Sequence, residues 1–166
     1  LAAAVTGAGG LGMIGGGYGE REWLEREFAA AGNARVGVGF ITWSLARQPD
    51  LLALALDRAP ACVMLSFGDI APFVPAIKAA GVALICQVQT VAEARQVVDQ
   101  GADIVVAQGT EAGGHGGARA TLPLVPAVVD ALGGSVPVAA AGGIADGRGL
   151  AAALMLGADG VLMGTR

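Results

Sequence analysis

The sequence predicts a parallel α/β fold in which buried strands alternate with amphipathic helices. Apolar residues make up 54% of the chain and charged residues 14%, against roughly 25% charged residues in an average soluble domain. Short, continuous apolar runs recur along the chain, which is typical of strands covered on both faces of a sheet. Most of these runs begin 21 to 26 residues apart, and that distance is the length of one βα unit.

The strand candidates are β-branched apolar runs bounded by glycine, proline or charged residues. A weaker candidate at residues 11–14 comes first in the chain. The stronger candidates are residues 35–41, 61–66, 82–88, 103–107, 136–141 and 160–163.

Helical spacing of apolar residues fills the segments between these runs. Leu24, Phe28 and Ala31 fall at i, i+4 and i+7, and the same spacing recurs after later strands. Thr90 and Glu93 have the spacing of a capping box, which predicts a helix start. Glycines stand where the helices should end, at Gly32, Gly81, Gly101, Gly133 and Gly157.

Two architectures fit this repeat, an open doubly wound sheet and a closed (βα)8 barrel. Seven strands are countable, whereas a complete barrel usually needs about 250 residues. The barrel interpretation therefore requires a first strand before Leu1 and a last helix after Arg166. We expect one domain over residues 1–166, an α/β (βα)8 TIM barrel that is incomplete at both ends.

Charge and hydropathy exclude several classes of partner. The net charge of −4 and the pI near 4.8 argue against nucleic acid, because phosphate contacts need clustered Lys and Arg. Apolar stretches are interrupted before they reach about 18 residues, so we expect no transmembrane helix. The first residues lack the basic start of a signal peptide, and we expect a cytoplasmic location. Cys62 and Cys86 lie in apolar runs and are expected to be reduced core thiols; the alternative is a single disulfide between them.

Two neighbouring strand ends near the C-terminus carry glycines. Gly142 and Gly143 follow the run at 136–141, and Gly164 with Thr165 follows the last run. Glycine lets backbone N–H groups approach an anion closely, and a helix N-terminus adds partial positive charge. The pair of strand ends predicts one shared phosphate site; the alternative is that each glycine only forms a tight turn.

The strand at 103–107 is followed by an unusually long polar segment, residues 108–122. It carries His115, the chain's one histidine, between glycines. An imidazole on a glycine loop at a strand end can act as a general base near neutral pH. The alternative is an exposed loop histidine without a task. We expect no metal site, because there is no second histidine or Cys/His cluster. Glu111 could orient the loop or accept backbone hydrogen bonds.

A third glycine-rich segment, residues 5–17, has spacing similar to a dinucleotide-binding fingerprint. No adequate strand precedes these glycines, and no acidic residue follows at the expected place. A turn between a first helix and the weak strand at 11–14 is the better interpretation.

The segment from Gln108 to Gly116, QGTEAGGHG, resembles the signature of the nitronate monooxygenase (2-nitropropane dioxygenase-like) family. The segments at 141–147 and 163–166 resemble the same family, and the resemblance extends over essentially the whole chain. It implies a (βα)8 barrel that binds FMN non-covalently. It also implies oxidation of alkyl nitronates by O2 to a carbonyl compound and nitrite.

The resemblance further implies roles for individual residues. His115 matches the family's catalytic histidine, which serves as a base or as a hydrogen-bond donor to the nitro group. The implied FMN contacts are Gln87 at the isoalloxazine ring, Gly113 and Gly114 beside the flavin, Ala141, Gly142 and Gly143 in one phosphate loop, and Gly164 and Thr165 in the other. A Gly142→Val substitution is accordingly expected to exclude the phosphate.

Related groups share this signature, so other activities stay open. FMN-dependent NAD(P)H:quinone reductases and enoyl-acyl carrier protein reductases use the same barrel. A barrel that binds a phosphate ligand without catalysis would keep the glycines and have no use for His115. The expected partners are a small nitronate or nitroalkane and O2, and the oligomeric state is not predicted.

Overall fold

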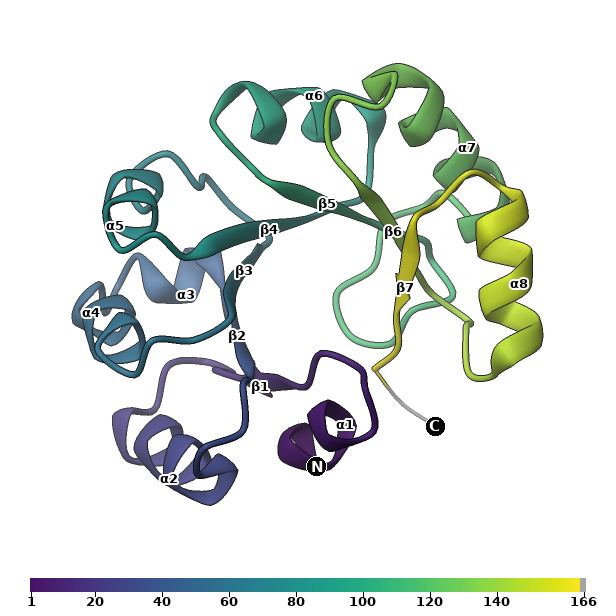
Figure 1. Cartoon of the computed structure of the whole chain (residues 1–166). Helices are drawn as coiled ribbons and strands as arrows, with labels where there is room; N and C mark the ends of the chain where they lie inside the picture. The colour runs from purple at the N-terminus through teal and green to yellow at the C-terminus, as the bar shows by residue number, and fades with distance from the viewer. Residues whose placement is uncertain (165–166) are drawn as a thin grey trace. The chain divides into compact units, whose positions relative to one another are not determined.

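The computed structural model describes residues 1–164, which form two compact units. The first unit runs from Leu1 to Ile85, and the second begins at Cys86. Helices and strands alternate along both (Figure 1). The single domain over residues 1–166 stays a prediction.

The first unit is a series of short helices between parallel strands. Strand β1 pairs with β2, and β2 pairs with β3, each in parallel register. The elements are α1 (Ala2–Gly7), β1 (Met13–Gly15), α2 (Arg21–Ala31), β2 (Gly37–Ile41), α3 (Thr42–Leu45), α4 (Asp50–Leu56), β3 (Cys62–Ser66) and α5 (Val74–Ala79). Strand β4 (Ala83–Val88) contains the boundary between the units.

The second unit continues the same alternation. Strand β5 pairs with β6 and β6 pairs with β7, again in parallel. The elements are α6 (Val91–Asp99), β5 (Ile104–Gln108), α7 (Thr121–Leu132), β6 (Val138–Ala141), α8 (Gly147–Met155) and β7 (Gly160–Leu162). From β1 to β7 the strand order follows the chain order, without the reversal of a doubly wound sheet. This order favours the barrel over the open sheet.

Every predicted strand is present, with ends shifted by one or two residues. The run at 35–41, for example, forms β2 from Gly37 onward. Strands β2, β3, β4 and β6 begin one or two residues later than their runs, whereas β7 begins at the predicted residue. The five predicted glycine helix ends are also confirmed, since all have φ between +57° and +106°. Within the segment at 5–17, residues 8–12 form the predicted turn between α1 and β1.

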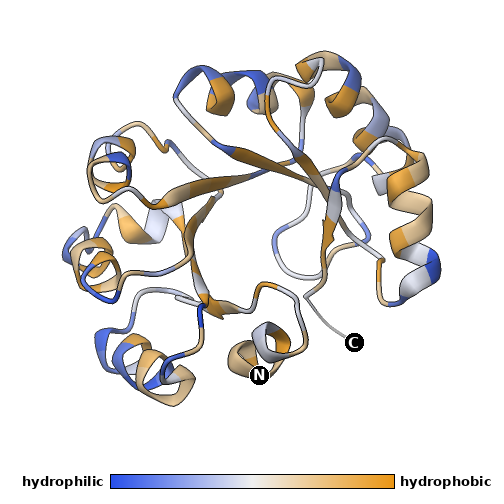
Figure 2. Cartoon of the chain, viewed as in Figure 1, coloured by the Kyte–Doolittle hydropathy of each residue, from blue (hydrophilic) through white to orange (hydrophobic). Residues whose placement is uncertain are grey.

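Apolar side chains from the helices cover the strands. In the second unit Leu124, Val125 and Val128 of α7 are fully buried, and α7 packs on β5, β6 and α6. Burial of one such side chain stabilises the fold by about 1.5–3 kcal/mol. Strands β4, β5 and β6 are hydrophobic over most of their length, whereas α2 and α6 also carry hydrophilic residues (Figure 2).

Cys62 and Cys86 are both buried, and neither forms a disulfide in the part of the chain that the structure describes, as predicted. Burial raises the pKa of the Cys62 thiol to about 11, so this group is inert at neutral pH. Within residues 1–164, no helix is both long and apolar enough to cross a membrane. The cytoplasmic location stays a prediction.

Candidate active site

The long polar segment after β5 forms a loop, as the sequence predicts. It leaves the strand at Gln108, carries the exposed His115, and ends where α7 begins at Thr121. Gly113 and Gly114 are exposed within it, and Gly114 has φ +80°. We refer to residues 109–120 as the histidine loop. It lies at the carboxyl end of a parallel strand, where (βα)8 barrels place their active sites.

Two glutamine side chains hold the backbone carbonyl of His115, and a third glutamine bonds to one of them. The Nε2 atom of Gln89 donates to this carbonyl at 3.1 Å, and that of Gln108 donates to it at 3.3 Å. The Oε1 atom of Gln108 accepts from Nε2 of Gln87 at 2.9 Å and from Nε2 of Gln89 at 3.0 Å. We call Gln87, Gln89 and Gln108 the amide cluster. It fixes the peptide that carries the histidine.

The positions of these amides follow from the sequence. Gln87 lies in β4 and Gln89 directly follows its last residue, so two positions of strand alternation bring both side chains to the same side. Just beyond them, the predicted capping box at Thr90 and Glu93 is confirmed. A carboxylate oxygen of Glu93 also accepts from the backbone N–H of Gln89 at 2.7 Å. The helix start therefore holds the strand end that presents the amides.

Gln87 was predicted as a flavin contact, whereas no role was predicted for Gln89 or Gln108. Gln108 is 5% exposed, at the last position of a strand that is otherwise apolar. A buried amide must have hydrogen-bond partners. Glutamines occur at the ends of two successive strands, β4 and β5. This feature of the sequence could have predicted the cluster.

Glu111 anchors the start of the histidine loop to α7. One of its carboxylate oxygens accepts from the backbone N–H of Thr121 at 2.8 Å and from the Thr121 hydroxyl at 2.7 Å. These two hydrogen bonds, the hydroxyl first, hold the pKa of the Glu111 carboxyl below its usual value. The question that the sequence left open is answered: Glu111 accepts bonds from the first residue of α7.

The histidine loop is also tied to the end of β6. Gly109 donates its backbone N–H to the carbonyl of Ala141 at 2.9 Å. The Thr121 hydroxyl lies 3.1 Å from the carbonyl oxygen of Gly142. A Cβ atom added to Gly143 would lie 3.2 Å from Cβ of Glu111. The structure thus brings the predicted residues of the first phosphate loop against the histidine loop.

Gly142 is required by packing within the protein. Its φ is +113°, and an added Cβ would lie 2.6 Å from Oγ1 of Thr121 and 3.1 Å from the carbonyl oxygen of Gly109. The expectation that Gly142→Val would act by excluding a phosphate is therefore corrected, because the new side chain would first collide with the protein itself.

The second glycine strand end lies beside the first. Ala141 of β6 is in register with Leu162 of β7, so Gly142 and Gly164 leave neighbouring strands near the same edge. Gly164 is exposed, and an added Cβ would meet no described atom within 4 Å. Thr165, predicted with it, lies outside the described residues.

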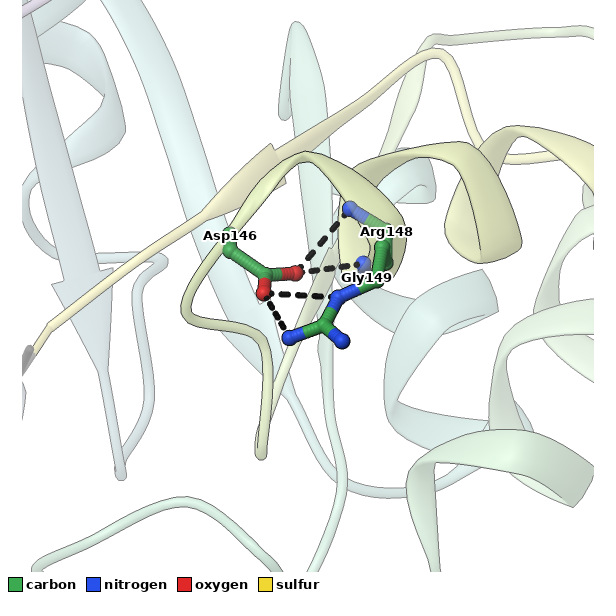
Figure 3. Close-up of polar contacts among 3 residues, drawn as sticks. All are labelled: Asp146, Arg148 and Gly149. Atoms are coloured by element: carbon green, nitrogen blue, oxygen red, sulfur yellow. Dashed lines mark hydrogen bonds and ion pairs between the residues drawn. The ribbon is translucent and has the colours of Figure 1, made fainter.

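The first turn of α8, whose cap Asp146 lies three residues after Gly143, already has a carboxylate on its backbone N–H groups. Asp146 accepts from the backbone N–H groups of Arg148 at 3.0 Å and Gly149 at 3.2 Å (Figure 3). The Arg148 guanidinium, 2.6 Å away, and then the Gly149 N–H hold the pKa of the Asp146 carboxyl below its usual value. An anion at this edge must therefore rely on the glycine backbone more than on the α8 N-terminus, contrary to the sequence-based expectation.

Sequential parallel βα units with a site at the strand carboxyl ends place the chain in the (βα)8-barrel class. The family model for nitronate monooxygenase matches residues 29–166, and the chain belongs to this family. A nitronate monooxygenase of Pseudomonas aeruginosa is 43% identical over 88% of the chain and 45% of the relative.

Two further relatives resemble the whole chain. A protein of Rhodococcus jostii, named (3aS,4S,5R,7aS)-5-hydroxy-7a-methyl-1-oxo-octahydro-1H-indene-4-carboxyl-CoA dehydrogenase, is 38% identical over 100% of the chain and 47% of its own length. The FabK (M276A) mutant structure from Thermotoga maritima has a TM-score of 0.88 and 39% identity, covering 99% of this chain and 56% of that one. The chain thus spans about half the length of the relatives it matches.

Proposed function

We propose that the protein binds FMN and oxidises alkyl nitronates with O2 to a carbonyl compound and nitrite. The observation that carries the proposal is a histidine loop fixed against a glycine strand end in a chain of the nitronate monooxygenase family. The substrate would be a small nitronate or nitroalkane.

The described residues fit a phosphate-bearing cofactor at the strand ends. Gly143 and Gly164 are exposed at the ends of neighbouring strands, and the space beside Gly164 is open among the described atoms. With Ala141, Gly142 and Thr165 they would hold the phosphate. Gly113 and Gly114 would lie beside the flavin, and Gln87 would contact its ring. Bound FMN would supply a two-electron oxidant for the nitronate.

His115 would act on the substrate directly, as a base or as a hydrogen-bond donor to the nitro group. An imidazole exchanges a proton near neutral pH, so it suits either task. The amide cluster holds the residue-115 carbonyl, and Glu111 holds the loop start to α7. The loop is therefore organised before a substrate arrives.

A second candidate is a reductase or dehydrogenase on the same barrel. The Rhodococcus jostii relative, which matches the whole chain, carries a dehydrogenase name. Anaerobic mixing separates the two candidates. We expect nitronate to bleach the flavin of the whole protein and NADPH to leave it oxidised. Bleaching by NADPH alone would overturn the monooxygenase proposal in favour of the reductase.

The same reaction tests the histidine. We expect His115→Asn to lower turnover of nitronate by about 10²–10⁴-fold, the usual contribution of a positioned acid–base group, with flavin still bound. Steady-state oxygen consumption and the flavin absorbance measure the two effects. Undiminished turnover would show that His115 takes no part.

Gly164→Val tests the phosphate site without disturbing the packing. The new side chain would enter space that is open among residues 1–164 and that we assign to the phosphate. We expect weaker FMN binding by equilibrium dialysis and an unchanged urea midpoint of the apoprotein. Equal FMN affinity in Gly164→Val and wild type would contradict this placement.

A further inference from the structure

The amide cluster acts on one atom of the histidine loop. Two side-chain N–H groups, from Gln89 and Gln108, converge on the backbone carbonyl oxygen of His115 at 3.1 and 3.3 Å. Both amides also bond to each other, because Gln89 donates to Oε1 of Gln108 at 3.0 Å. Within the described residues, these contacts tie the middle of the loop to the ends of β4 and β5.

The sequence of the loop explains why such a tether matters. His115 lies between Gly113, Gly114, Gly116 and Gly117. Glycine has more backbone conformations than any other residue. Fixing an untethered run of glycines in one conformation therefore costs much conformational entropy. Capture of the carbonyl of residue 115 itself restricts the position from which the imidazole extends.

We propose that Gln108 and Gln89 are positioning residues for His115. They act through the peptide that carries the histidine, because its carbonyl is the group to which both side chains donate. Gln108 is the central member, because its amide accepts from Gln87 and Gln89 and donates to residue 115. This inference rests on the proposed function only for the catalytic task of His115; the tether itself is a structural claim.

The first experiment removes the central amide with Gln108→Leu in the whole protein. Misplacement of a reacting group by about 1 Å costs about 10²-fold in rate, and we expect a loss of kcat of that size with little change in flavin binding. Gln96→Leu, the same substitution at an exposed position on α6, is the matched control and should keep wild-type kcat. Should Gln108→Leu fail to fold, Gln89→Leu removes the other donor from a less buried position.

The second experiment, Gln108→Glu, gives a pH signature that a merely structural role would not produce. A glutamate keeps the acceptor for Gln87 and Gln89, but it donates to the carbonyl of residue 115 only when protonated. We expect the kcat ratio of Gln108→Glu to wild type to rise as pH falls. A ratio independent of pH would contradict the proposal.

A third readout does not depend on turnover. The ring resonances of His115, assigned by their absence in His115→Asn, should shift in Gln108→Leu and remain at wild-type positions in Gln96→Leu. Unchanged resonances in Gln108→Leu would overturn the tether, whatever the activity. Shifted resonances with wild-type kcat would overturn the positioning role, provided that His115→Asn is inactive. If His115→Asn is fully active, the proposed function fails instead.

Discussion

The histidine loop and the glycine turn after β6 lie against each other but are held in different ways. Side-chain hydrogen bonds from Gln89, Gln108 and Glu111 restrain the histidine loop. The turn at Gly142 is held by backbone conformation and by contact distances that leave no room for a side chain. The polar tethers fix the peptide of His115, for which we propose a catalytic role, whereas the close-packed glycine at position 142 maintains the fold beside it.

The sharpest test of this difference is Gly142→Val, which should give the largest loss of stability. The valine would combine a φ of +113° with contacts at 2.6 and 3.1 Å. Such backbone strain and overpacking each cost about 1–3 kcal/mol. We expect the free energy of unfolding of the apoprotein to fall by about 3 kcal/mol in urea denaturation.

Gly164→Val is the control, since its Cβ would meet no described atom within 4 Å and its urea midpoint should not move. If both variants unfold at the wild-type midpoint, packing does not explain the glycine at position 142. The turn after β6 would then not be held by the close packing that distinguishes it from the histidine loop.

The sequence was sufficient for the strands because each is a continuous apolar run cut by glycine or charge. It was also sufficient for the capping box at Thr90 and the left-handed helix ends, since these depend on local residue types. The clash at Gly142 was not predictable, because its partners Thr121 and Gly109 are distant in the chain. The hydrogen bonds within the amide cluster likewise join residues 19 and 21 positions apart, and Gln89 reaches His115 across 26 positions.

The α8 N-terminus is a different case, because its contacts are local in the sequence. A strand end followed by a helix start predicts an anion site on general grounds. Asp146 nevertheless has its carboxylate on the N–H groups of that turn, with Arg148 beside it. An aspartate at this position is a common helix cap, so the sequence did contain the signal.

The smallest expected effect comes from the charge that holds the histidine loop to α7. Glu111→Gln keeps an oxygen that accepts from Thr121 but removes the negative charge at the start of the helix. A negative group there stabilises a helix by about 0.3–1 kcal/mol, and solvent screening at this exposed position favours the lower end. We therefore expect a small decrease in unfolding free energy at pH 7.

The pH dependence of this decrease has a defined sign. The folded-state pKa of Glu111 lies below the usual value of 4.5, so its contribution is fully present above that pH. The contribution disappears as pH falls through the folded-state pKa, so wild type and Glu111→Gln should converge in acid. Asp130→Asn, which removes a charge from the other end of the same helix, should not lower stability at pH 7. A difference between wild type and Glu111→Gln that stays constant from pH 7 into acid would show that the tether works through hydrogen bonds alone.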